Sequence, residues 1–124
     1  MDEQPPVAGS GTKEAMSLLK ETKGLAIQWG MHYAVKIAMR KLTVHSREVW
    51  EEMARDGVLP SYGKAFWLGS VFRELKSAGV LVKTGHFFKY SDEARNIHER
   101  TVPLWELNDK ADLTPYRVPP KEKP

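Results

Sequence analysis

A helix signal that runs through a glycine directly into strand-like residues is the feature that most constrains this fold. Residues 61–78 repeat apolar side chains at the spacing of one helix face, namely Leu68, Val71, Phe72 and Leu75. Ser61 can cap the first turn of such a helix, and Gly79 stands where a helix needs a left-handed closing residue. We therefore expect a helix over 61–78 with this face in the core.

The residues after this helix predict a β-hairpin. Residues 80–83 and 87–90 are strand-like runs, rich in β-branched and aromatic residues, and Gly85 lies between them where a tight turn favours glycine. After a polar loop, residues 102–107 are expected to add a further strand. Because proline cannot donate to a sheet ladder, Pro103 is expected at a sheet edge or at a strand start.

Two more helices and a short strand are expected before residue 61. Residues 13–42 repeat apolar side chains at three- and four-residue steps, which predicts an amphipathic helix. Gly24 costs about 1 kcal/mol relative to alanine in a helix interior, which favours a break there. Residues 42–44 are long enough only for an edge strand, and Ser46 can cap a helix that ends at Asp56.

The length of 124 residues suits one modest hydrophobic core and is too short for two ordinary domains. Residues 1–12 contain Pro and Gly and gain little by ordering, so we expect a flexible arm. Residues 108–124 carry four Pro among charged residues, which predicts a disordered Pro-rich tail. The expected fold class is α+β, with one domain over 13–107.

The expected order of helix, short strand, helix, helix and hairpin resembles that of winged helix-turn-helix domains. Residues 71–81 and 102–105 also resemble small bacteriophage-encoded winged-helix proteins, in which a helix ends in an Ala-Gly-aliphatic turn and the wing closes on a Val-Pro-x-Trp strand. The resemblance implies a three-helix core plus a β-hairpin wing, with an extended N-terminal helix. It implies double-stranded DNA as the partner, and a role in transcription, replication or recombination control of a phage or prophage in the host cytoplasm.

Residues of the helix over 61–78, the recognition helix in this resemblance, would enter the major groove. Arg73 is the leading candidate for a base or phosphate contact, because a guanidinium can bond a guanine edge with two hydrogen bonds. The other candidates on this helix are Lys64, Phe66, Ser70, Lys76 and Ser77. Glu74 makes the helix less basic, and these charges could equally be ordinary solvated side chains.

The wing, expected over 80–90, and the loop after it supply the remaining DNA-binding candidates. They are Lys83, His86, Lys89, Arg95 and Arg100. Residues 61–100 contain seven Lys or Arg and four Asp or Glu, a net charge of +3 that equals the formal charge of the whole chain. A small excess of this kind favours a polyanionic partner without requiring one.

The aromatic residues leave a second hypothesis open. A stacking platform for single-stranded nucleic acid could be built from Trp50, Phe72, Phe87, Phe88 and Trp105, but most are expected in the core of so small a domain. Tyr62, Phe66 and Trp67 are expected to be exposed, which would also suit a protein interface. The alternative function is a protein-protein adaptor or host-factor-binding module, with a homodimer or partner held by the helix over 13–42.

Catalysis is the least expected class of function. The four histidines are spread over different elements and are expected at the surface or in turns, so no metal site is predicted. We find no phosphate-cradling glycine loop and no nucleophile elbow, so no cofactor is expected. The chain has no cysteine, no apolar run of about 20 residues and an acidic start unlike a secretory signal, so a cytoplasmic location is expected.

Overall fold

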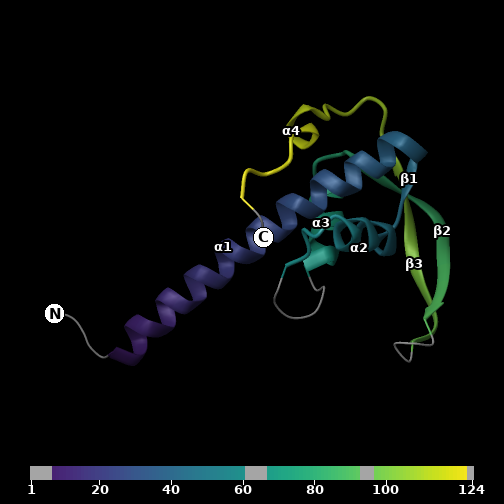
Figure 1. The fold of residues 1–124 in the computed structure, drawn as a ribbon. Helices are drawn as coiled ribbons and strands as arrows, with labels where there is room; N and C mark the ends of the chain where they lie inside the picture. Colours follow the sequence, from purple (N-terminus) through teal and green to yellow (C-terminus); the bar gives the residue numbers. More distant parts are fainter. Residues whose placement is uncertain (1–6, 61–66, 93–96, 123–124) are drawn as a thin grey trace.

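The computed structural model describes residues 7–60, 67–92 and 97–122, and their side chains over 24–60, 67–91 and 99–122. This part of the chain is α+β, with four helices and one three-stranded antiparallel sheet of order β1-β3-β2 (Figure 1). The elements are α1 (Val7–Lys41), β1 (Thr43–Val44), α2 (Ser46–Arg55), α3 (Trp67–Ser77), β2 (Leu81–Asp92), β3 (Ile97–Leu107) and α4 (Thr114–Arg117). No helix in these ranges combines the length and the apolar character needed to cross a bilayer.

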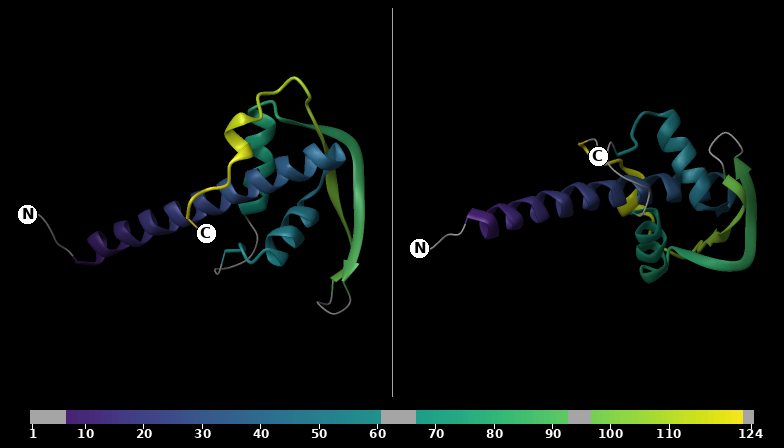
Figure 2. Two further views of the ribbon diagram at one scale, coloured as in Figure 1. Left: turned by 45° about the horizontal axis from the view of Figure 1, so that its top comes forward. Right: turned by 90° about the horizontal axis from the view of Figure 1, so that it is seen from below.

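Helix α1 is a single continuous helix, so the predicted break at Gly24 is wrong. It begins at Val7, inside the arm expected over 1–12, and its N-terminal half extends away from the sheet and the other helices (Figures 1 and 2). Packing of its C-terminal half offsets the free-energy cost of placing glycine inside a helix. A Cβ at Gly30 would lie 2.5 Å from Val71 Cγ2, so glycine is required where α1 crosses α3.

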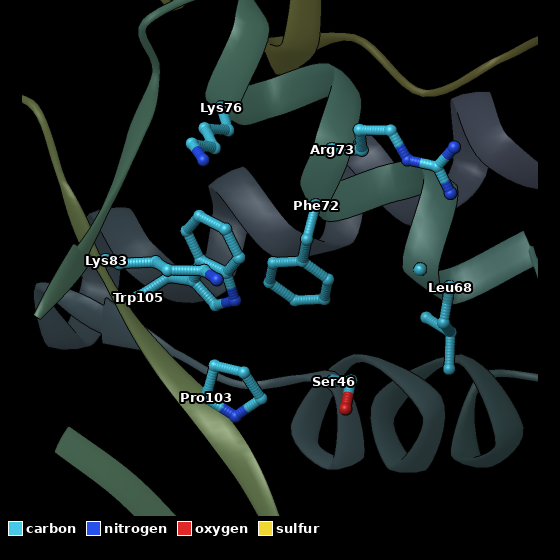
Figure 3. Close-up of a pocket in the computed structure, with 9 residues that line it drawn as sticks. Ser46, Leu68, Phe72, Arg73, Lys76, Lys83, Pro103 and Trp105 are labelled. Atoms are coloured by element: carbon cyan, nitrogen blue, oxygen red, sulfur yellow. The ribbon is translucent and has the colours of Figure 1, made fainter. Parts of the chain in front are cut away.

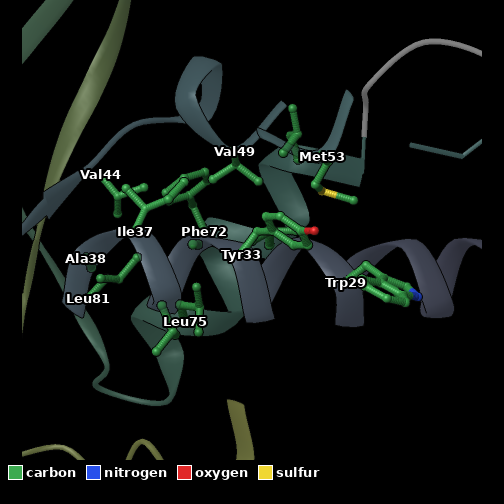
Figure 4. Close-up of a cluster of buried hydrophobic side chains, with 14 of the residues drawn as sticks. Trp29, Tyr33, Ile37, Ala38, Val44, Val49, Met53, Phe72, Leu75 and Leu81 are labelled. Carbon is green, nitrogen blue, oxygen red and sulfur yellow. The ribbon is translucent and has the colours of Figure 1, made fainter. Parts of the chain in front are cut away.

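The core lies between α1, α2, α3 and the sheet (Figure 4). The predicted core face of α3 is confirmed, because Leu68, Val71, Phe72 and Leu75 are all buried. They meet buried side chains from the other elements, which include Ile37, Ala38, Val44, Val49, Met53 and Leu81. Gly79 has a φ of 75°, and Val80 N donates to Leu75 O, so the closing turn of α3 has the predicted left-handed glycine.

Helix α2 is capped by His45 and not by Ser46 as predicted. The Glu48 amide donates to His45 Nδ1 at 3.3 Å, and the His45 amide donates to Glu48 Oε1 at 3.2 Å. This reciprocal capping box needs the imidazole as an acceptor. His45 is buried, which corrects the expectation that all four histidines lie at the surface or in turns.

The hairpin predicted within 80–90 is wrong, because these residues form one strand, β2, which pairs with β3. Gly85, with a φ of 85°, lies in a bulge between the pairs Lys83–Trp105 and Phe87–Pro103. A glycine with positive φ serves a bulge as well as a turn, so the local signal could not separate them. The strand expected over 102–107 is confirmed as part of β3.

Pro103 lies in the central strand, where the order of the sheet alone would exclude proline. However, β1 pairs only with Trp105 and Glu106, so β3 has β2 as its one neighbouring strand at Pro103. The expectation of a local edge position therefore agrees with the observed pairing.

Residues 108–122 differ from the expected disordered tail. They contain α4 and pack along α1, where Trp29 Nε1 donates to the Glu122 carbonyl at 2.6 Å and His32 Nδ1 donates to the Tyr116 carbonyl at 2.7 Å. Leu113 and Tyr116 pack against the core. The prolines exclude a long helix here, but these two apolar side chains give the segment a surface to bury.

Candidate nucleic-acid interface

A groove of about 460 Å³ lies between α3, the N-terminal end of α2 and the sheet (Figure 3). We call it the α3–sheet groove, and its lining residues are Ser46, Leu68, Gly69, Phe72, Arg73, Lys76, Lys83, Pro103 and Trp105. Helix α3 supplies five of them, namely the buried Leu68 and Phe72 and the exposed Gly69, Arg73 and Lys76. The groove therefore joins one flank of α3 to the face of the β2–β3 hairpin that carries Trp105.

The floor of the groove is apolar. The rings of Phe72 and Trp105 stack with their centroids 5.6 Å apart and an interplanar angle of 24°. Both side chains are buried, as is Leu68, and Pro103 continues the floor along β3. Because the floor is part of the hydrophobic core, its shape is set by the packing of the whole domain.

The rim of the groove is cationic. Arg73 and Lys76 come from α3, and Lys83 comes from β2, with its Nζ 5.5 Å from the centroid of the Trp105 ring. Figure 3 shows Lys76 and Lys83 pointing toward the Phe72–Trp105 pair, while Arg73 points away from it. Among the described residues, none of these three cations forms an ion pair. Their charges are available to an anionic partner.

The structure brings only part of the predicted set together. On α3, Ser77 is exposed and Ser70 is half-buried, and neither lines the groove. On the β2–β3 hairpin, His86, Lys89 and Arg100 are exposed, but Lys89 pairs with Thr101 while Arg100 pairs with Tyr90, so the two cations point to opposite faces of the sheet. The remaining candidates lie outside the residues whose side chains are described: Lys64, Phe66 and Arg95.

Three aromatic side chains contradict the sequence expectation. Trp67, expected to be exposed, is 3% exposed because it packs against α1 at Gly30. Phe87 and Phe88, expected in the core, are 63% and 39% exposed. The reason is that the second half of β2 continues past the body of the domain, where its pairing partner is β3 (Figure 2).

A ladder of stacked side chains, which the sequence did not predict, joins the β2–β3 hairpin to α2. His45 and Phe88 stack at 4.0 Å with an interplanar angle of 10°, and Phe88 stacks on Tyr90 at 6.4 Å. The guanidinium of Arg47 then lies 4.9 Å from the centroid of Tyr90 and 5.4 Å from that of Trp50. We call these five residues the hairpin ladder. It holds the hairpin at a defined angle to α2.

Burial is the main reason that the pKa of His45 lies below its usual value. The carboxylates of Glu48 and Glu51 oppose this shift, while the cations of Lys41 and Arg47 reinforce it. A neutral imidazole suits the observed geometry, because Nδ1 accepts the hydrogen bond from the Glu48 amide.

No group of three or more His, Cys, Asp or Glu residues that could hold a metal ion occurs in the described part of the chain. A scan against protein-family models, a search of curated proteins and a search of solved structures find no match to this chain.

Proposed function

We propose that this chain is a winged-helix DNA-binding protein, with α3 as the recognition helix and the β2–β3 hairpin as the wing. The order α1, β1, α2, α3, β2, β3 and a three-stranded sheet with β1 at one edge support a winged helix. In this class, the recognition helix lies in the major groove and the wing contacts the backbone beside it.

The observation that carries the proposal is the rim of the α3–sheet groove. Arg73 and Lys76 of α3 and Lys83 of the wing flank one groove, and none of them is neutralised by a carboxylate of the described residues. Duplex DNA carries one negative charge per about 1.7 Å of its axis, so cations from two neighbouring elements can contact successive phosphates. The exposed Lys89 extends this basic surface along the wing.

Fluorescence anisotropy with mixed-sequence duplexes of about 25 base pairs tests the proposal at several salt concentrations. Wild-type protein should bind at micromolar concentration in low salt. Lys76→Gln and Lys83→Gln should each reduce the slope of log K against log salt by about 0.9. Lys121→Gln is the matched control, because Lys121 is exposed on the C-terminal segment, away from the groove. Absence of duplex binding, or equal losses in all three variants, would contradict the proposal.

A second candidate function is protein docking through α1. Its N-terminal half extends away from the rest of the domain (Figures 1 and 2). An isolated helix of fewer than about 15 residues is marginal in water, and most helices in proteins depend on packing. A second copy of the chain along this half would supply that packing, and it would also place two recognition helices on one duplex.

Light scattering and circular dichroism over a range of protein concentrations test this candidate. A dimer should appear together with a rise in helix content as the concentration increases. A monomer with constant helix content up to the highest concentration would exclude self-association through α1. Duplex binding by that monomer would support the DNA-binding proposal and exclude the α1 dimer.

A further inference from the structure

The apolar floor of the α3–sheet groove has no use in a contact with phosphates alone. A duplex presents charged phosphates and sugars to a basic surface, and cations are sufficient to bind them. This groove adds the stacked pair Phe72 and Trp105 and the ring of Pro103 beneath its cations. Its volume of about 460 Å³ lies in the range of roughly 300–1,000 Å³ for sites that hold small-molecule ligands.

Phe87 extends this apolar surface beyond the groove. The pairs Lys83–Trp105 and Phe87–Pro103 put these four side chains on one face of the hairpin, because directly paired residues of antiparallel strands point to the same side. Phe87 is 63% exposed, the largest exposed fraction of any described aromatic residue. An exposed phenyl ring beside lysine ammonium groups is the arrangement that stacks a nucleobase while its phosphate is neutralised.

We propose that the α3–sheet groove and Phe87 bind an unpaired nucleotide, so that the protein prefers a junction between single-stranded and duplex DNA over a blunt duplex. This inference rests on the proposed DNA-binding function. The base stacks on Phe87 and enters over Pro103 toward the floor, and Lys76 and Lys83 neutralise its phosphates. Lys83 is exposed and lies over the Trp105 ring, so its aliphatic stem moves aside when a base enters while its ammonium stays at the rim.

The hairpin ladder is what makes this site preformed. A wing that moved freely would lose entropy when it closed on a single base. Here the second half of β2 is held to α2 through Phe88 and Tyr90, which stack on His45 and contact Arg47 from the face opposite Phe87. The backbone of Phe87, which pairs with Pro103 of the groove floor, is thereby held in place although the Phe87 ring is largely uncovered.

Fluorescence anisotropy with three matched DNA molecules tests the inference. The first is a blunt duplex of about 20 base pairs, the second carries a short thymidine extension, and the third carries an abasic extension with the same phosphates. We expect the thymidine extension to bind at least about fivefold more tightly than the abasic one, because stacking of one base on an aromatic side chain contributes at least this much. A 2-aminopurine placed at the first unpaired position should lose fluorescence when the protein stacks on it.

Variants of two exposed apolar residues on opposite faces of β2 complete the test. Phe87→Ala should remove the gain from thymidine and leave blunt-duplex binding unchanged, and Phe87→Trp should keep the gain. Val82→Ala is the matched control, since Val82 is 51% exposed and points to the other face. Blunt-duplex binding with equal affinity for the thymidine and abasic extensions overturns this inference alone. Failure to bind any of the three DNA molecules overturns the proposed function as well.

Discussion

The two sides of this molecule use their positive charges differently. Along α2 and the last turn of α1, the cations are paired: Arg40 with Glu52, Lys41 with Glu48, Arg47 with Glu51 at 3.1 Å, and Arg55 with Glu52 at 3.4 Å. Around the α3–sheet groove, Arg73, Lys76 and Lys83 have no such partner among the described residues. The net charge of +3 therefore understates the positive charge around the groove. The paired cations contribute to the fold, and only the unpaired ones can attract an anion.

Reversal of two unpaired charges should give the largest effect. We expect the double variant Lys76→Glu and Lys83→Glu to bind duplex DNA at least about a hundredfold more weakly at low salt, because each substitution replaces a phosphate contact by repulsion. Its thermal unfolding should match that of wild type. A double variant of Lys110 and Lys121 to Glu, with the same change in net charge, is the control in the anisotropy measurement. Equal losses in both double variants would mean that only net charge matters.

Removal of a paired charge should lower stability and leave DNA binding unchanged. Glu52 is 8% exposed and accepts from Arg40, and it also lies near Arg55. We expect Glu52→Gln to lower the free energy of unfolding by about 1–2 kcal/mol, because a buried hydrogen bond to a charged group is weakened. DNA affinity should stay unchanged. Urea denaturation gives the first quantity, and Glu51→Gln is the control, since its exposed pair with Arg47 should contribute less than about 1 kcal/mol.

A third prediction concerns His45, which lies between the two sides. The pKa of His45 in the folded protein lies below its ordinary value of 6.5, chiefly through burial. The unfolded chain therefore binds more protons just below pH 6.5, so stability is complete above this pH and falls as the pH drops below it. The slope cannot exceed about 1.4 kcal/mol per pH unit for one group. Denaturation of wild type and of His45→Asn, which keeps a capping acceptor, should show this slope only in wild type.

The smallest effect is expected at Gly69, where one substitution should change stability and another should change DNA binding. A Cβ at this exposed helix position meets nothing within 4 Å. We therefore expect Gly69→Ala to stabilise the fold by about 0.5–1 kcal/mol. Gly69→Leu should fold equally well but fill part of the α3–sheet groove, so the preference for a thymidine extension should fall. If this variant keeps the full preference in anisotropy, the unpaired base does not enter the groove beside Gly69.

Local signals predicted the parts of this structure that depend on residues close in sequence. The spacing of Leu68, Val71, Phe72 and Leu75 identified the buried face of α3, and Gly79 identified its end. These predictions succeeded because helix periodicity and a left-handed glycine are set within one or two turns.

Several of the incorrect predictions depended on contacts between distant residues. Gly85 has the same positive φ in a bulge as in a turn, and only the pairing of β2 with β3 separates the two. Trp67 is buried because Gly30, on another helix, leaves room for its ring. The grouping of Lys76 with Lys83 in one groove likewise requires the packed sheet, although both residues were candidates from the sequence.

The contact of the C-terminal segment with α1 has a consequence for the order in which the molecule is completed. Trp29 and Glu122 are separated by 93 positions in the chain, so their hydrogen bond cannot form during synthesis until residue 122 has been added. Contacts of shorter sequence separation form more readily, so the helices and the hairpin should pack before the C-terminal segment docks on α1. Newly made chains should therefore pass through a stage in which the domain is folded and the face of α1 around Trp29 is still open to chaperones or to other copies.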